Sequence, residues 1–346
     1  MSPTAEAARR LFGLAACATA GSLVAIWLDL PVPLMTGPAA LTAAVSLAGW
    51  HQHFPIRLRD AVFLVAGIAI GTGVSRDSLA AIATWPLAFL IMTLGLLAMM
   101  QISASYLARV HAYDRRSAVL ASSPGHMSFV FALGEASGSD VRAIVVAQSV
   151  RVMSLTLLVP LAARAFGIET GIGLTPPGAV VVEMSLRQTA LCIVAALALF
   201  PLVRAARLPA PVLLAGMIVG AAARLSDLAP GGLSHWLSYP ALALIGTLIG
   251  TRFSGVTLAE LRRYGAAGLA ITLVAAALSA AAAWLASSLV GMPFVQVLVA
   301  FAPGGLETMN VLGAAIGADP GFVAAGHVLR LLMLSFLVPY WLGRVR

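Results

Sequence analysis

Long apolar stretches follow one another along almost the whole chain, separated by short polar connections. Ten of them have 16 to 25 residues, close to the roughly 17 to 25 that an α-helix needs to cross a bilayer. They lie near residues 11–28, 33–50, 60–75, 85–108, 142–166, 180–203, 209–224, 236–251, 264–287 and 321–342. We therefore predict an all-α polytopic membrane protein with about ten transmembrane helices.

Prolines, glycines and charged residues recur within these apolar surroundings at a nearly fixed spacing, as they do where membrane helices break and polar groups face inward. At an offset of 179 the pairs are Pro124/Pro303, Gly125/Gly304, Asp140/Asp319, Arg151/Arg330, Pro160/Pro339, Gly67/Gly246, Gly71/Gly250, Thr72/Thr251 and Ser75/Ser254, and at 178 they are Pro31/Pro209 and Pro33/Pro211. We predict an internal duplication, with residues 1–170 as the first membrane repeat and residues 171–346 as the second.

A shorter apolar piece lies between the fourth and fifth stretches of each half, at 117–133 and 296–312, and each contains Pro-Gly. If this piece is re-entrant and returns to the same side, each half crosses the membrane five times and the second half is inverted. If it spans the membrane, each half has six crossings and the halves are parallel. The sequence leaves the path of this discontinuous segment open, so arginine placement has to discriminate.

Equivalent loops carry opposite charge biases, which the positive-inside rule predicts for inverted repeats. The loop with Arg109, Arg115 and Arg116 corresponds to 288–293, which has no charged residue. Conversely, the loop that holds only Arg76 corresponds to a loop that holds Arg252, Arg262 and Arg263. We therefore predict two inverted five-helix repeats with both termini cytoplasmic.

The composition agrees with a membrane protein and argues against a nucleic-acid partner. Hydrophobic residues make up 60% of the chain and charged residues only 10%, against roughly 25% charged in soluble domains. All 21 basic residues are arginine and the net charge is +8, but they lie mostly in short loops. No hydrophilic segment is long enough for a DNA-binding module, so the expected partner is the lipid bilayer.

The two Pro-Gly segments form the candidate binding site. Proline frees backbone carbonyls and glycine lets the chain leave helical geometry, which membranes tolerate only beside protein or a water-lined cavity. A helix that restarts there points its positive end at that cavity, which suits an anion. A simple kink is the alternative, but recurrence in both halves favours a site. The candidates are Ser123, Pro124, Gly125, His126, Pro303, Gly304, Gly305 and Glu307.

Arg151 and Arg330 lie 11 residues beyond Asp140 and Asp319, the predicted helix N-caps, and hence about 16 Å into their helices. Gln148 and His327, three residues earlier, share the same helix faces and complete the candidate set. Each arginine could form a structural ion pair or cap the freed carbonyls. Alternatively, its guanidinium could coordinate an anionic solute.

Three further features of the sequence are open or unremarkable. Glu307, whose equivalent is Ser128, could carry a coupling proton or partner Arg330. His126 and His327 alone make a weak metal site, so we expect neither a metal nor another cofactor. The methionines Met92, Met99 and Met100 are interpreted as lipid-facing or core residues.

Two segments carry a resemblance to a known family: SSPGHMSFVFALGEASGSDVRAIVVAQSVRV (122–152) and APGGLETMNVLGAAIGADPGFVAAGHVLRLLM (302–333). In these segments, and over nearly its whole length, the chain resembles the AbrB-type integral membrane proteins, which have a duplicated AbrB membrane domain. In the first half His126 replaces the second glycine of the family pattern, and Ser128-Phe129 stands where an acidic residue is usual.

The resemblance implies a multi-pass protein of the bacterial inner membrane. Members are described as transporters, as ammonia monooxygenases, or as regulators of gene expression. The DNA binding of a soluble regulator that shares the name is not implied.

We predict a secondary transporter of a small anionic solute, bound between the two Pro-Gly segments. The alternative is a membrane sensor that acts indirectly on gene expression through a partner protein. A membrane enzyme is disfavoured, because copper or iron chemistry needs clustered ligands and the six histidines are scattered. The sequence leaves open the solute, the direction of transport, coupling to a proton or sodium ion, and assembly as a homodimer.

Overall fold

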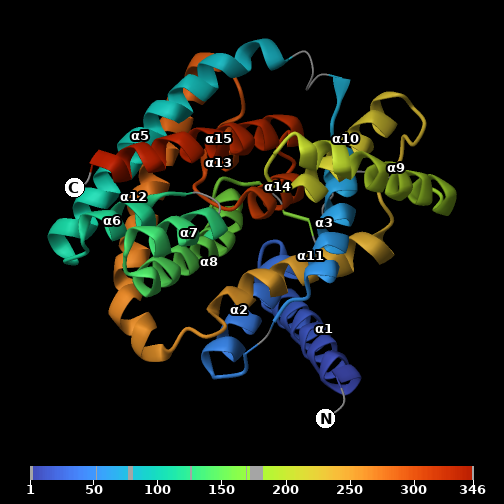
Figure 1. The fold of residues 1–346 in the computed structure, drawn as a ribbon. Coiled ribbons are helices and arrows are strands. Elements are labelled where there is room, and N and C mark those ends of the chain that lie inside the picture. The colour runs from blue at the N-terminus through green and yellow to red at the C-terminus, as the bar shows by residue number, and fades with distance from the viewer. Residues whose placement is uncertain are drawn as a thin grey trace. The chain divides into compact units, whose positions relative to one another are not determined.

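The computed structural model describes residues 3–51, 53–76, 81–124, 127–168, 170–171 and 182–344. Their regular structure is helical apart from one isolated bridge between Glu183 and Gly232. In the first half the α-helices are α1 (Pro3–Trp27), α2 (Pro33–Leu47), α3 (Ile56–Gly71), α5 (Trp85–Val110), α6 (Arg115–Ser122), α7 (Met127–Ser137) and α8 (Val141–Ala165) (Figure 1).

In the second half they are α9 (Leu186–Ala205), α10 (Pro211–Leu225), α11 (His235–Gly250), α12 (Leu258–Val290), α13 (Phe294–Phe301), α14 (Leu306–Ala315) and α15 (Pro320–Arg344). Two 3₁₀ turns, η1 (Ala81–Thr84) and η2 (Thr251–Phe253), precede α5 and α12. Each predicted apolar stretch overlaps a helix, and each shorter Pro-Gly piece is divided into two helices.

Within the described residues, six helical segments are long and apolar enough to cross a membrane. They are Arg9–Trp27, Ala81–Val110, Val141–Ala165, Leu186–Ala205, Leu258–Val290 and Pro320–Gly343. The helices α2, α3, α10 and α11 have only 15 or 16 residues, or about 24 Å at most, whereas the hydrocarbon core is about 30 Å thick. The multi-pass helical class is therefore confirmed, while the count of ten crossings stays a prediction.

The helices of the two halves correspond in order, and four equivalent pairs have the same length. The members of the pairs α2/α10, α3/α11, α6/α13 and α8/α15 have 15, 16, 8 and 25 residues respectively. Val32 and Ala210, 178 residues apart, are both left-handed, with φ of 49° and 47°. Each precedes a proline at the first helical position, where proline is preferred. This correspondence is what the predicted repeats, 1–170 and 171–346, would produce.

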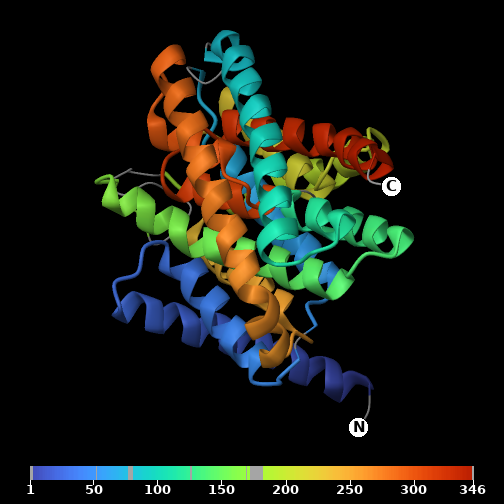
Figure 2. The same cartoon turned by 90° about the vertical axis from the view of Figure 1, so that its left-hand side faces the viewer.

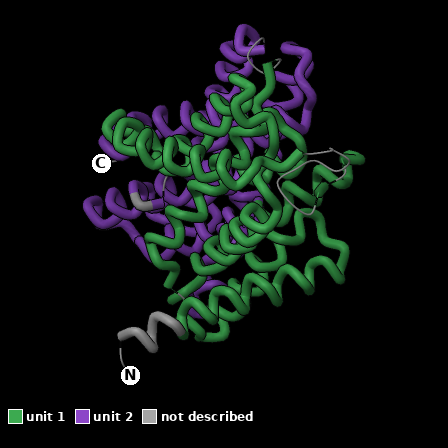
Figure 3. The backbone as a smooth tube through the Cα atoms, turned by 90° about the vertical axis from the view of Figure 1, so that its right-hand side faces the viewer, with its two compact units in different colours: residues 1–80, 156–255, 310–321 green, residues 81–155, 256–309, 322–346 purple. Residues whose placement is uncertain are grey.

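The chain divides into two compact units that each take residues from both halves (Figure 3). Unit 1 comprises residues 1–80, 156–255 and 310–321, and unit 2 comprises residues 81–155, 256–309 and 322–346. The compact units therefore differ from the two sequence repeats. Helices of the first half must pack on helices of the second half within each unit.

In unit 1 each half places a glycine against a helix of the other half, and the two contacts are equivalent in the sequence repeat. A Cβ at Gly67 of α3 would overlap the carbonyl oxygen of Leu213 in α10, and a Cβ at Gly246 of α11 would overlap that of Met35 in α2. Both glycines and both carbonyls are equivalent pairs in the sequence repeat. Without a side chain, each glycine lets two helix backbones approach closely.

In unit 2 the equivalent helices α5 and α12 are long antiparallel neighbours, cyan and orange in Figure 2. At one end the hydroxyl of Thr84, which precedes α5, lies 4.0 Å from the sulfur of Met292, which follows α12. At the other end the rings of Tyr113 and Tyr264 are 6.2 Å apart. The two chain directions are therefore opposed along the whole contact.

Unit 2 also contains a pair of equivalent glycine contacts between the two halves, between α12 and α8 and between α15 and α5. A Cβ at Gly268 of α12 would lie 3.0 Å from the Cα of Ala147 in α8. A Cβ at Gly326 of α15 would lie 3.4 Å from the ring of Phe89 in α5. Gly268 is equivalent to Phe89, and Gly326 is equivalent to Ala147, so the two contacts are reciprocal.

Replacement of Gly67 or Gly246 with alanine tests the exchanged contacts in unit 1. We expect each variant to lose about 1 to 3 kcal/mol of stability, because the added methyl group forces two backbones apart. Thermal unfolding of the detergent-solubilised chain measures the loss. Gly343→Ala is the matched control, since nothing lies within 4 Å of a Cβ at that helical position. Equal melting temperatures for all three variants would contradict the close approach.

Candidate functional site

The first Pro-Gly segment lies between the two arms of a helical hairpin, α6 and α7. Asp114 caps α6 by accepting the N–H of Ser117 at 2.9 Å. Beside this cap, Arg116 donates to the carbonyl of Ser137 at the end of α7, at 3.1 Å. The N–H of Asp140 donates to the Ser117 hydroxyl at 2.8 Å. The start of α6 and the end of α7 therefore lie together.

A glutamine and an arginine of α8 hold the broken end of α6. Gln148 donates through Nε2 to the carbonyls of Leu120 at 3.0 Å and Ser123 at 2.8 Å. Arg151 donates to the Ser123 carbonyl at 3.2 Å and to the Gln148 side-chain oxygen. Both side chains are buried. They supply donors to terminal carbonyls that have no partner inside the helix.

In the second half a buried arginine likewise donates hydrogen bonds to carbonyls at the end of α13. Arg330 of α15 donates to the carbonyls of Ala302 and Gly304, each at 2.5 Å, and is only 2% exposed. The structure thus places both deep arginines as donors to freed carbonyls of their own half. Among the described residues Arg330 has no ion pair, so the suggested pairing with Glu307 is not formed.

The remaining predicted residues of the breaks lie around these contacts. Ser123, Pro124, Pro303 and Gly304 are buried, whereas Gly305 and Glu307 are partly exposed. Gly125 and His126 lie outside the described residues.

His327 occupies the position equivalent to Gln148, and the two differ in their contacts. Its ring is completely buried and lies beside the carbonyl of Val299. Neither ring nitrogen makes a well-formed hydrogen bond within the described part of the chain. Gln148 and Arg151 are joined to each other, but His327 and Arg330 have no such bond among the described contacts. The two halves are therefore chemically unequal at equivalent positions.

A crevice in unit 2 opens beside the second break, and Arg330 and Pro303 form part of its wall. The crevice is small, with room for about one water molecule. The other lining residues are Met92, Gly95, Leu96 and Met99 of α5, Ser279 and Ala282 of α12, and Phe301 of α13. Of these residues, sequence reasoning considered only Met92 and Met99, as lipid-facing or core residues. The seven-residue spacing of Met92 and Met99 indicates only a shared helix face.

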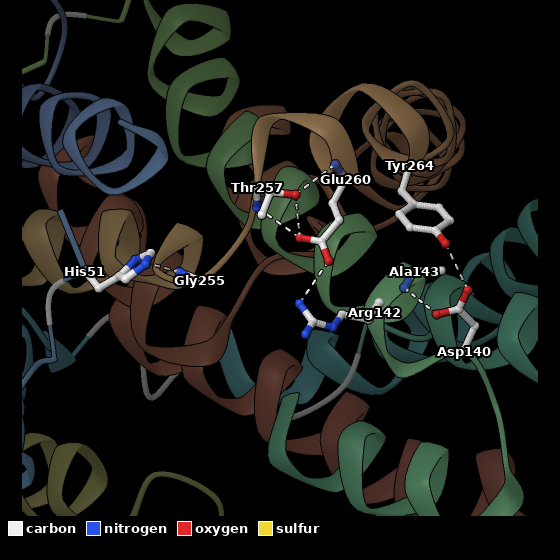
Figure 4. Close-up of polar contacts among 8 residues, drawn as sticks. All are labelled: His51, Asp140, Arg142, Ala143, Gly255, Thr257, Glu260 and Tyr264. Carbon is white, nitrogen blue, oxygen red and sulfur yellow. Dashed lines mark hydrogen bonds and ion pairs between the residues drawn. The ribbon is translucent and has the colours of Figure 1, made fainter. Parts of the chain in front are cut away.

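A polar cluster joins the starts of α8 and α12 at one end of unit 2 (Figure 4). Asp140 accepts the N–H of Ala143 at 3.0 Å, which confirms the predicted N-cap, and accepts the Tyr264 hydroxyl at 3.1 Å. Arg142 forms an ion pair with Glu260 at 2.9 Å. Each contact between α8 and α12 links the first half to the second.

The aromatic contacts beside this cluster make the same end rich in arginine and tyrosine. The guanidinium of Arg263 lies over the ring of Tyr264, 5.1 Å from its centre. Tyr113 lies edge-on to Tyr264, and burial raises the pKa of the Tyr113 phenol well above its ordinary value.

The fold and the bonded breaks define a polytopic helical membrane protein in which buried arginines hold interrupted helices. A family model described as "Transition state regulatory protein AbrB" matches residues 35–346. The chain therefore belongs to the AbrB family, as its two Pro-Gly segments indicated.

Two relatives cover most of the chain. The chain is 27% identical over 321 residues to "Putative regulator AbrB" of Escherichia coli (strain K12). The alignment covers 90% of this chain and 89% of that protein. The chain is 23% identical over 291 residues to "Uncharacterized protein YhjN" of Bacillus subtilis (strain 168), which covers 80% of this chain and 75% of that protein.

Substitution of Gln148 with methionine tests how the first break is held. We expect a loss of about 1 to 3 kcal/mol, because methionine has a similar shape but leaves buried carbonyls without their donor. Thermal unfolding in detergent measures the change. Gln101→Met, at an exposed position of α5, is the control and should be nearly neutral. A Gln148→Met protein as stable as this control would contradict the proposed role.

Proposed function

We propose that the protein is a secondary transporter of a small anionic solute in the bacterial inner membrane, with its binding site at the two broken segments. The observation that carries the proposal is the guanidinium of Arg330, which is 2% exposed and lines a crevice beside the second break. A charged group at this depth in a membrane protein indicates function by default. The first-half residues from Ser123 to His126, with Gln148 and Arg151, are proposed to complete the site.

The charge of Arg330 is only partly compensated. Its two described hydrogen bonds go to carbonyl oxygens, which are dipoles and carry no net charge. A guanidinium has five N–H donors, so donors remain for a further acceptor. An anion in the crevice would supply both the acceptor and the opposite charge, which makes an anionic solute the best match.

The packing of unit 2 supports the inverted five-plus-five topology. Equivalent helices run in the same direction across a membrane when repeats are parallel and in opposite directions when they are inverted. The equivalent helices α5 and α12 are both long enough to span and are antiparallel neighbours. The hairpin of α6 and α7 supports a re-entrant first break, because its two ends lie together.

The charges at one pair of equivalent positions agree with this topology. Asp29 and Arg207, 178 residues apart, are both left-handed, with φ of 51° and 56°. In the proposed topology Arg207 is cytoplasmic and Asp29 lies on the opposite side. The positive-inside rule predicts the arginine on the cytoplasmic side. Both termini are then cytoplasmic as well.

An indirect regulator is the second candidate, and the printed name of the Escherichia coli relative favours it. In that function the chain would sense a solute in the membrane and pass the signal to a partner protein. Neither relative's printed name is that of an enzyme, and we do not propose catalysis.

Cysteine labelling tests the inverted topology. With the buried Cys17 and Cys192 replaced by serine, we introduce Leu28→Cys or Ala206→Cys at equivalent exposed positions. A membrane-impermeant maleimide should label Leu28→Cys in intact cells and Ala206→Cys only after lysis, because the two connections lie on opposite sides. Labelling of both from the same side would favour parallel repeats.

Loss of the deep arginines tests transport. We expect Arg151→Ala and Arg330→Ala each to lower solute uptake into proteoliposomes by a factor of at least about 100, because each variant would lose two charge-assisted hydrogen bonds to the solute. Membrane insertion should persist. Arg187→Ala, at an exposed position, is the control and should transport normally. Wild-type uptake by both deep-arginine variants would count decisively against the proposal.

A further inference from the structure

Four arginines gather at the end of unit 2 where α5 stops and α12 begins. Arg109 lies in the last turn of α5, Arg115 begins α6, and Arg262 and Arg263 lie in the early part of α12. All four are exposed. None of them forms an ion pair within the described part of the chain. We call these four residues the arginine patch.

Two touching tyrosines bring the arginine patch together. Tyr113, in the connection between α5 and α6, has its ring 6.2 Å from the ring of Tyr264 in α12. Each arginine of the patch lies within four residues of one of these tyrosines. The guanidinium of Arg263 also lies over the Tyr264 ring, 5.1 Å from its centre, as in a cation–π contact. The patch is therefore assembled from three helices and from both halves of the chain.

The acidic residues nearest to the patch are engaged by other groups. Asp114 caps α6, and Asp140 caps α8 and accepts the hydroxyl of Tyr264. Glu260 takes part in the capping box of α12 and pairs with Arg142 (Figure 4). Each carboxylate thus already has donors of its own. An anion from outside the chain can compensate the patch without breaking these contacts.

The exposed face of α12 indicates where the patch lies in a membrane. Arg262, Leu269, Leu273 and Trp284 are all exposed, and their spacing places them on one side of the helix. Arg262 and Trp284 are 22 residues apart, or about 33 Å along a helix, close to the roughly 30 Å of the hydrocarbon core. Tryptophan is enriched at membrane interfaces. With Trp284 at one interface, Arg262 reaches the lipid headgroups at the other.

This arrangement matches a phospholipid better than a soluble ion. A phosphodiester offers two oxygens to a planar guanidinium, and acyl chains cover apolar surface such as that of Leu269 and Leu273. A free phosphate would leave that surface uncovered. A zwitterionic headgroup also carries a quaternary ammonium, which four arginines would repel. The matching ligand is a lipid whose headgroup has a net negative charge.

We propose that the arginine patch binds the headgroup of an anionic phospholipid, whose chains lie along the exposed face of α12. In the proposed topology the patch lies at the cytoplasmic leaflet, where a negative surface potential attracts basic segments. One bound headgroup would join α5 and α6 of the first half to α12 of the second. The proposal is independent of whether the protein transports a solute.

Mass spectrometry of the intact full-length protein in detergent tests the class of lipid. The probes are phosphatidylglycerol and phosphatidylcholine with the same acyl chains, and soluble glycerol phosphate is the competitor. We expect phosphatidylglycerol to bind at least about tenfold more tightly than phosphatidylcholine, as charge-assisted hydrogen bonds imply. Equal binding of the two lipids would overturn the proposal. Displacement of phosphatidylglycerol by an equal concentration of glycerol phosphate would indicate a soluble ligand instead.

Paired substitutions assign the binding to the patch. Arg262→Gln with Arg263→Gln, and separately Arg109→Gln with Arg115→Gln, should each raise the dissociation constant of phosphatidylglycerol at least about tenfold. The control pair, Arg57→Gln with Arg204→Gln, removes two exposed arginines of unit 1 that are cytoplasmic in the proposed topology. It should leave the dissociation constant nearly unchanged. An equal loss in the control would show that only the total charge matters and would overturn the site.

A lysine pair separates loss of charge from loss of structure. Arg262→Lys with Arg263→Lys keeps both charges, and lysine also binds phosphate as a point charge. It should bind phosphatidylglycerol more tightly than the glutamine pair at the same positions. Melting temperatures without added lipid should be alike for wild type and both pairs. If the lysine pair is folded and binds as weakly as the glutamine pair, charge does not determine binding and the proposal fails.

Discussion

Hydrogen bonding of two arginines to interrupted helices is the interaction on which the rest of the structure depends. A helix that breaks within an apolar protein frees carbonyl groups that lipid cannot satisfy. In each half the helix after the break supplies the missing donors, from Arg151 in α8 and from Arg330 in α15. Each arginine thus fixes the position of its broken segment relative to the following helix.

The same bonds explain why the two halves can differ in function. Carbonyl dipoles orient a guanidinium without cancelling its charge, so a structural role does not exclude a role in binding. In the first half Gln148 takes part of the bonding and contacts Arg151. Among the described contacts of the second half, His327 makes no comparable bond to a carbonyl or to Arg330. Divergence at this equivalent position therefore changes how the broken segment and its arginine are held.

Local signals predicted much of the fold. Apolar length located the helices, Pro-Gly located the breaks, and Asp140 caps α8 as its position indicated. The recurrence of Gly67 as Gly246 located a pair of close helix contacts, but not the helices that they touch. Met92 and Met99 are buried, in agreement with their interpretation as core residues, and they also line the crevice. Spacing identifies a helix face, whereas the neighbour of that face depends on tertiary packing.

The reciprocal glycine contacts bear on how such a chain could have arisen. Gly67 packs against the backbone of Leu213, and Gly246 packs against the backbone of Met35. A single copy of the repeat would therefore lack both contacts. On the proposed duplication, the single-copy ancestor would have worked as a pair of identical molecules. Once the two genes were joined, the two copies no longer had to have the same sequence. One copy could then become specialised for ligand recognition while the other kept the scaffold intact.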